Sequence, residues 1–292
     1  MARAPHRPDP QPGRPAVAEC LLGLHRRAGG GLTVAAAVIT LDRPAPRVAR
    51  LLINRPDKRN AIDHAVRQAM TDALRELAAD PGVRALVLGG TGGVFSAGGD
   101  LPSMAGLDEA AARERMAHIH NLCRLIAEAP CAVVSAIEGV GAGGAIGLAL
   151  LGDEIIVGTG TRILFPFLKL GLTPDWGQML TLPRRVGLPA ARRLLTGGGP
   201  LDGAEAHRLG LADEVTADDA VMARAIERAA ALAQLPRDAL RRMNRRLEAP
   251  SATLAAELVR EADDQARCLT GAEFAEGYGA FMNRRAADFT DL

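Results

Sequence analysis

Several features that mark common protein classes are scarce or missing in this chain of 292 residues. Its four cysteines are widely separated and form no Cys-x-x-Cys pair, so neither a zinc site nor a disulfide framework is indicated. No uninterrupted apolar run reaches the length of about 18 residues that a membrane-spanning helix needs. The 35 basic and 34 acidic residues nearly cancel, so no overall field favours nucleic acid or an anionic membrane. These absences predict a cytoplasmic protein with buried thiols and no metal, nucleic-acid or membrane partner.

The first 32 residues differ in composition from the rest of the chain. They are rich in proline and, unlike a transit peptide, contain no serine. Arg26 and Arg27 precede an apolar run, as in some export signals. That run, however, passes directly into a strand, a proline-containing turn and a second strand over about 33–54. We therefore predict a poorly ordered extension over 1–32.

After this hairpin, helical spacing of apolar residues alternates with short apolar runs bounded by glycine or proline. Strand-like runs at 83–90 and 131–139 alternate with helical patterns at 57–80 and 113–130. This order predicts an α/β core over 33–217, followed by a helical region over 218–292. Within that region the helical patterns lie near 218–234, 236–248, 251–269 and 271–285.

Two stretches, 86–101 and 133–150, share the order strand, glycine-rich bend, helix. Glycine carries no reactive side chain but lets a ligand approach the main chain, so chemistry at these bends would come from backbone amides. Two amides that converge on one oxygen stabilise a developing oxyanion, each by about 2.7–4 kcal/mol of barrier. Close packing of strand against helix uses glycines in the same way, and the residues alone leave both interpretations open.

Gly139, Gly141 and Gly144 also fit the Gly-x-Gly-x-x-Gly pattern of dinucleotide-binding folds. Such a fold has an acidic residue about 20 positions further on, at the end of the next strand. Residues 157–163 contain no acidic residue, and no phosphate-binding Gly-x-x-x-x-Gly-Lys-Ser/Thr loop occurs. A nucleotide cofactor is therefore disfavoured.

Six segments that occur in order from about residue 33 to the C-terminus resemble the crotonase superfamily of enoyl-CoA hydratases and isomerases. They are LLINRPDKRNAID, VFSAGGDL, GVGAGGAIGLALLGD, KLGLTPDWGQMLTLPRRVG, AHRLGLADEV and EGYGAFMNRRAADF. The resemblance implies a spiral of ββα units with a C-terminal helical region that packs subunits into trimers, often paired into hexamers. It also implies an acyl-CoA thioester substrate, with coenzyme A as part of that substrate and no separate cofactor.

By this resemblance, the thioester carbonyl oxygen accepts hydrogen bonds from the amides of Ala97 and Gly144. Gly98, Gly99 and Asp100 then line the thioester, with Asp100 capping or bracing its helix rather than moving protons.

The resemblance also implies contacts to coenzyme A. The segment that ends at Ala61 would meet its adenine and phosphates, with Lys58 and Arg59 near the phosphates. A solvated start of a helix is an equally good interpretation of that basic pair. Arg284 stands where many relatives have a lysine that reaches coenzyme A across a subunit interface.

Relatives that hydrate a double bond use two glutamates, and this chain has Gly147 and Phe167 at those positions. Because neither residue can take a proton, hydration is disfavoured. Asp175 stands where the branch of 1,2-epoxyphenylacetyl-CoA and Δ3,Δ2-enoyl-CoA isomerases has a single acid/base. An apolar wall that includes Phe167 and Trp176 would raise the pKa of Asp175. The alternative is that Asp175, which follows a proline, caps the next helix.

Other ionisable residues are weaker candidates. His118 and His120 are two positions apart on a helix and so do not share a face as a metal pair would. Glu109 and Glu114 lie on the variable helix beside the acyl pocket, where a substitute base could be found.

These observations predict an acyl-CoA isomerase-like enzyme that shifts a carbon–carbon double bond through a thioester enolate, with Asp175 as acid/base. An enoyl-CoA hydratase is the alternative within the family. From another class, the chain could be a non-catalytic CoA-thioester binder or assembly subunit.

Overall fold

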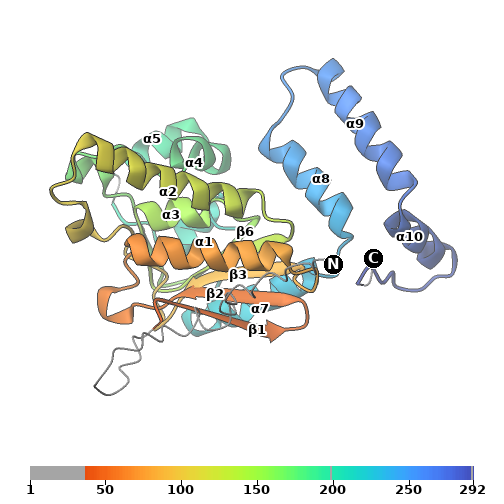
Figure 1. Ribbon diagram of the computed structural model, residues 1–292, viewed down its shortest axis with the longest axis horizontal. Coiled ribbons are helices and arrows are strands. Elements are labelled where there is room, and N and C mark those ends of the chain that lie inside the picture. The colour runs from red at the N-terminus through yellow and green to blue at the C-terminus, as the bar shows by residue number, and fades with distance from the viewer. Residues whose placement is uncertain (1–36, 198, 291) are drawn as a thin grey trace, which may run out of the picture. The chain divides into compact units, whose positions relative to one another are not determined.

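The computed structural model describes residues 37–197, 199–290 and 292, so the extension predicted over 1–32 lies outside the described residues. Over these residues the chain forms a six-stranded sheet in the order β1-β2-β3-β4-β6-β8, and a two-stranded sheet of β5 and β7 (Figure 1). Among the described residues, no helix has both the length and the apolar character that spanning a lipid bilayer requires.

The large sheet is parallel apart from its first strand. β1 pairs antiparallel with β2, as the predicted hairpin requires, and the remaining neighbours pair in parallel. Crossover helices between parallel strands cover both faces of such a sheet. The strands are β1 (Ile39–Ala45), β2 (Val48–Ile53), β3 (Ala85–Gly90), β4 (Ala132–Ile137), β6 (Glu154–Gly158) and β8 (Glu214–Thr216), and the small sheet consists of β5 (Val140–Ala142) and β7 (Arg162–Leu164).

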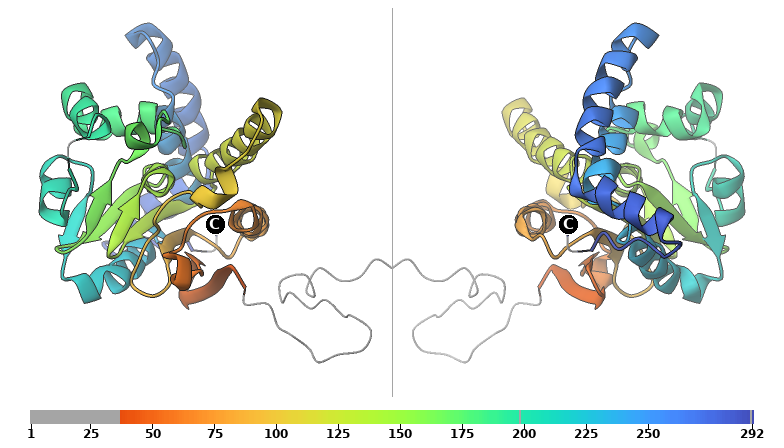
Figure 2. Two further views of the ribbon diagram at one scale, coloured as in Figure 1. Left: turned by 90° about the vertical axis from the view of Figure 1, so that its left-hand side faces the viewer. Right: turned by 90° about the vertical axis from the view of Figure 1, so that its right-hand side faces the viewer.

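Alternate residues of each central strand enter two separate cores. In β3, Leu86 and Leu88 pack on the side of α1 (His64–Ala79) and α2 (Glu109–Ala127). Ala85 and Val87 pack on the opposite side, against α7 (Val221–Leu232) (Figure 2). The period of two residues that separates the faces of a strand thus explains why these strands are apolar throughout.

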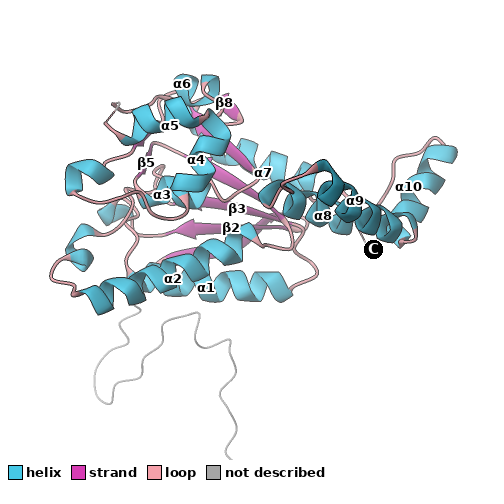
Figure 3. Ribbon diagram, turned by 90° about the horizontal axis from the view of Figure 1, so that it is seen from above, coloured by secondary structure: helices cyan, strands magenta, loops and turns pink. Residues whose placement is uncertain are grey.

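The C-terminal helices fall into two groups. α7, which the sequence places with the helical region, packs its small residues on the sheet. α8 (Arg237–Glu248) and α9 (Leu254–Leu269) bury no residue, and α10 (Ala272–Met282) buries only Ala280. Figures 1 and 3 show these three helices extending past the end of the sheet.

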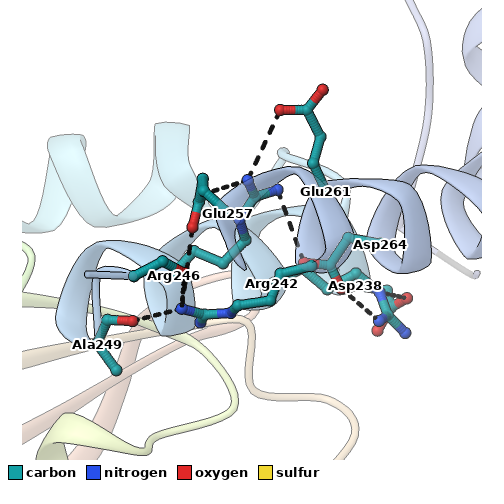
Figure 4. A network of polar contacts seen from close by, with 9 residues as sticks. Asp238, Arg242, Arg246, Ala249, Glu257, Glu261 and Asp264 are labelled. Carbon is teal, nitrogen blue, oxygen red and sulfur yellow. Dashed lines mark hydrogen bonds and ion pairs between the residues drawn. The ribbon is translucent and has the colours of Figure 1, made fainter. Parts of the chain in front are cut away.

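Ion pairs join α8 to α9 (Figure 4). Arg242 pairs with Asp238 on its own helix at 2.7 Å and with Asp264 on α9 at 3.0 Å. Arg246 pairs with Glu257 across the same helix pair. Because these side chains are only partly buried, the pairs set the geometry of the helix hairpin more than its stability.

The remaining elements are short helices and 3-10 turns, and among them α3 contacts α4. The helices are α3 (Gly144–Ala149), α4 (Gln178–Val186), α5 (Leu188–Leu195) and α6 (Gly203–Arg208), and the 3-10 turns are η2 (Pro56–Lys58), η3 (Leu101–Met104), η4 (Phe167–Leu170) and η5 (Asp218–Ala220).

Candidate active site

The first glycine loop is held between two neighbouring segments by backbone hydrogen bonds. On one side, the amide of Ser96 donates to Val140 of β5 at 3.0 Å. On the other side, the amide of Ile62 donates to the carbonyl of Gly98 at 2.8 Å, and the amide of Asp100 donates back to Ile62 at 3.1 Å. Successive amides of an extended segment point in opposite directions, so these bonds fix which amides remain available.

The structure corrects the choice of Ala97 as an oxyanion donor. Its amide points away from β5 and donates to the carbonyl of Arg59 at 2.8 Å, so it cannot bind a substrate. The amide of Gly98 is also engaged, because it donates to the hydroxyl oxygen of Ser96 at 3.0 Å. Gly99 lies opposite Ile62 in a parallel bridge, so its own amide points away from that segment, and it has no hydrogen-bond acceptor among the described residues.

The second glycine loop meets the first one at Gly144. Gly143 precedes α3 with φ +54°, a conformation that glycine adopts without strain, and Gly144 begins the helix. The first amides of a helix have no partner within the helix. A Cβ placed on Gly98 would lie 3.5 Å from the nitrogen of Gly144 and 2.5 Å from the carbonyl oxygen of Ala142. The two loops are therefore in direct contact.

Asp175 lies close to this junction, in the segment before α4. The alternative that it caps the helix is wrong, because the N-cap is Gly177 and no side chain makes a capping bond. Oδ1 of Asp175 is buried and has no hydrogen-bond partner among the described residues. Burial raises the pKa of this carboxyl, and the nearby charges of Arg115 and His120 partly offset that effect.

Trp176 fills the space beside Gly144 and Gly147. Its side chain is 2% exposed, and its backbone has the left-handed φ of +54°. A Cβ on Gly144 would lie 2.5 Å from the indole Nε1. A Cβ on Gly147 would overlap Trp176 Cβ and lie 3.0 Å from Gln178 Cγ. No side chain can extend from Gly147 in this packing, and Phe167, at the second glutamate position, is buried.

Gln178 links the second glycine loop to the segment of Asp175. Its Nε2 donates to the carbonyls of Gly143 and Asp175, both at 3.1 Å, and the side chain is fully buried. No sequence motif marks Gln178 as a functional residue. A glutamine in the first turn of an amphipathic helix gives no signal by itself, because only the fold brings Gly143 within its reach.

The residues proposed to bind coenzyme A lie on η2 and just after it. Lys58 and Arg59 are exposed, and Arg59 has a left-handed φ of +48°. Asn60 is fully buried and ties this turn to the first glycine loop, since its Nδ2 donates to Val94 at 2.6 Å. Ala61 is buried beside it. The two basic side chains are thus free to meet solvent or a ligand.

Asp100 does not cap its helix, although the resemblance implied that it could. Asp100 is at the N-cap position of η3, but its side chain makes no capping bond and lies 3.9 Å from Arg55. Arg284 follows α10, which Figures 1 and 3 place far from α3. Within one chain, Arg284 therefore does not join the other site residues.

Potential metal ligands do not cluster in this site. The described residues contain no group of three His, Cys, Asp or Glu side chains placed to hold a metal ion.

Comparison with known proteins gives this architecture its class. The family model for enoyl-CoA hydratase/isomerase matches residues 37–292. The chain is 32% identical over 250 residues to 1,2-epoxyphenylacetyl-CoA isomerase of Escherichia coli, covering 83% of this chain and 95% of that protein. It is 33% identical to human enoyl-CoA hydratase domain-containing protein 2, mitochondrial, covering 71% and 70%. The crystal structure of an enoyl-CoA hydratase from Polaromonas sp. JS666 superposes with a TM-score of 0.81 at 28% identity, covering 86% and 98%.

The fold is therefore the α/β crotonase fold with a C-terminal helical region. The chain belongs to the enoyl-CoA hydratase/isomerase family, whose enzymes act on acyl-CoA thioesters.

Proposed function

We propose that this enzyme moves a carbon–carbon double bond along an acyl-CoA, with Asp175 carrying the proton. The observation that supports this most is the Asp175 carboxyl, which is largely buried, caps no helix and has one oxygen without a partner among the described residues. A raised carboxyl pKa suits a group that must both take and return a proton near neutral pH.

The reaction begins when Asp175 takes a proton from C2 of a 3-enoyl thioester. The electron pair of that C–H bond enters a dienolate whose negative charge rests on the thioester oxygen. Asp175 then returns the same proton to C4, which leaves the 2-enoyl thioester. No water and no redox partner are needed, since the product is an isomer of the substrate.

The amides of Gly99 and Gly144 donate hydrogen bonds to the charged oxygen. The free direction of the Gly99 amide and the contact between the two loops support this pairing. Two such donors contribute about 5–8 kcal/mol to the lowering of the barrier. Gln178 acts as a positioning residue, because one side-chain amide holds the backbone of both the donor loop and the base.

Exclusion of a glutamate at residue 147 argues against hydration. A hydratase must orient a water molecule and remove a proton from it, and Trp176 occupies the space in which that carboxylate would lie. The name of the Escherichia coli relative is in line with isomerisation, whereas other relatives carry hydratase names.

We assign the coenzyme A part of the substrate to the exposed side of η2, with Lys58 and Arg59 as partners for its phosphates. Gly98, Asp100 and Phe167 belong to the wall around the thioester in this proposal.

A homotrimer, single or paired into a hexamer, completes the proposal and would bring Arg284 to a neighbouring subunit's site. The apolar side chains left exposed on α8, α9 and α10 support this assembly, because large apolar patches on a monomer mark association surfaces. They include Met243, Leu247, Leu254, Leu258, Val259, Phe274, Tyr278, Phe281 and Met282.

Deuterium exchange at C2 of hexanoyl-CoA, followed by NMR in D2O, tests the chemistry. Asp175→Asn should slow this exchange about 10²–10⁴-fold, because it removes the proton carrier while keeping the side-chain shape. Asp72→Asn is the matched control, since Asp72 is an exposed aspartate on α1, and it should exchange at the wild-type rate.

Three outcomes would contradict the proposal. Normal exchange by Asp175→Asn would remove Asp175 from its role. Wild-type protein that hydrates 2-butenoyl-CoA faster than it isomerises 3-hexenoyl-CoA would be a hydratase. Tight binding of hexanoyl-CoA without any exchange would identify a CoA-thioester binder.

A further inference from the structure

A cavity adjoins the proposed reaction centre. It has a volume of about 270 Å³ and lies between α1, α2 and the residues around the end of η3. Basic side chains dominate its lining. The lining includes His64, Arg67, Ser103, Glu114, Arg115 and His118.

Arg67 is the unusual member of this lining. Its side chain is only 4% exposed, and both Nε and Nη1 are buried without a hydrogen-bond partner among the described residues. Burial and the neighbouring charge of Arg115 lower the pKa of Arg67 to about 10. It therefore stays protonated at neutral pH. A buried cation without a partner is costly, and an anion that paired with it would relieve that cost.

Asp63 acts on Arg67, and Asp175 and Asp100 act on Arg115, but none of these carboxylates forms an ion pair with either arginine. Asp63 caps α1 through the amide of Val66 at 3.0 Å and pairs with Arg55 at 3.0 Å. Asp100 also faces Arg55, at 3.9 Å. In the described part of the chain, neither Arg67 nor Arg115 has a carboxylate oxygen within 4.0 Å of its guanidinium nitrogens.

The remaining lining groups leave the cavity cationic. Glu114 is its one acidic residue, and its side chain is exposed. The ring centroids of His64 and His118 lie 4.9 Å apart with their planes tilted by 34°, and the hydroxyl of Ser103 donates to the carbonyl of Asp100.

Arg115 connects this cavity to the thioester. Its Nη2 lies 3.3 Å from the position that a Cβ on Gly99 would take. If the Gly99 amide binds the thioester carbonyl, the guanidinium of Arg115 lies only a few carbon atoms along the acyl chain from that carbonyl.

We infer that this cavity receives a carboxylate at the far end of the acyl group, so that the substrate is the mono-CoA thioester of a dicarboxylic acid. The inference rests on the proposed function for the place of the thioester. Arg67 holds the distal carboxylate through charge-assisted hydrogen bonds, and Arg115 stands between that carboxylate and the thioester.

Binding affinity, measured without turnover, tests this inference independently of catalysis. Trp176 is the only tryptophan of the chain and packs against Gly144, so its fluorescence reports a bound thioester. Glutaryl-, adipyl- and pimeloyl-CoA are compared with pentanoyl-, hexanoyl- and heptanoyl-CoA, each pair matched in carbon number. At least one dicarboxylic member should bind about ten- to hundredfold more tightly than its partner.

Arg67→Met should abolish this preference while leaving the affinity for hexanoyl-CoA within about twofold of wild type, because only the distal carboxylate is expected to contact Arg67. Arg75→Met is the matched control, since Arg75 is an exposed arginine on the same helix. Arg67→Met should also melt no lower than wild type without ligand, because it removes a buried, unpaired charge.

The inference would be overturned if both members of every pair bound with equal affinity. It would also be overturned if a folded Arg67→Met protein lost the same affinity for both members of a pair. Free glutarate competing as well as glutaryl-CoA would also overturn it, because the cavity would then be a separate anion site. A failed C2 exchange, by contrast, would overturn the proposed catalysis and leave this binding test valid.

Discussion

Replacement of Gly147 by alanine tests the packing argument against hydration. The added methyl group would overlap Cβ of Trp176 and press on Cγ of Gln178 at 3.0 Å. Both neighbours are fixed, since Trp176 is 2% exposed and Gln178 is bonded to two carbonyls. The methyl group therefore cannot be accommodated by a simple change of rotamer.

Two effects of opposite sign set the size of the change. Alanine gains about 0.5–1 kcal/mol over glycine inside a helix. An extra carbon in a filled core costs about 1–3 kcal/mol. The net result should be a loss of about 1–2 kcal/mol, which lowers the melting temperature by about 2–8 °C for a chain of this size.

Gly279 provides the matched control. It lies inside α10, and a Cβ placed there has no atom within 4 Å outside the local helix. Gly279→Ala should therefore show only the helix gain of about 0.5–1 kcal/mol and melt slightly higher than wild type. The effect of a glycine-to-alanine substitution on stability should thus have opposite signs in α3 and α10.

Thermal melts of wild type, Gly147→Ala, Trp176→Gly and the double variant, with Gly279→Ala as control, test whether the space beside Gly147 is filled. Trp176→Gly removes the overlapping Cβ and suits the left-handed φ at this position, although it leaves a cavity. Without that overlap the alanine should stabilise the helix by about 0.5–1 kcal/mol instead of costing about 1–2 kcal/mol, which gives a coupling energy of about 1.5–3 kcal/mol. If Gly147→Ala melts at or above wild type while Gly279→Ala behaves as expected, the space beside Gly147 is open and the argument against a glutamate there fails.

Three further predictions concern Asp175 and the assembly. Burial raises the pKa of Asp175, so C2 exchange should fall as the pH drops through a value above the 3.8 of an ordinary aspartate, and Asp175→Asn should lack this step. A carboxyl with a raised folded-state pKa opposes folding above its unfolded pKa, so Asp175→Asn should melt higher than wild type at pH 7, with the difference vanishing below about pH 4. Light scattering should give the mass of three or six chains of 30.6 kDa, and Phe281→Glu should reduce it; a wild-type monomer would refute the assembly.

The choice between Ala97 and Gly99 shows where sequence patterns stop. The motif places a strand-like segment beside a glycine bend, but it does not say which amides of the segment point toward the substrate. The bonds of Ser96 to β5 and of Asp100 to Ile62 decide that direction. A shift of one residue reverses it, because successive amides of an extended chain alternate.

The burial of Arg67 has a signal in the sequence. It lies on α1 three residues before Met70 and seven before Leu74, both buried, so an arginine stands on the apolar face of that helix. That position is a signal of a special environment. The absence of a partner could not be predicted, because it depends on Asp63 and Asp100 being engaged by Arg55.

The sequence by itself determined the alternation of strands and helices, the two glycine loops, and the absence of glutamate at residues 147 and 167, because these follow from local periodicity and residue identity. Only the tertiary structure decided that Trp176 fills the space beside Gly147, that Gln178 joins the second glycine loop to the segment of Asp175, and that Arg67 and Arg115 share a cavity. Such contacts join residues far apart in the chain, and their distances depend on how whole helices pack, which local patterns do not encode.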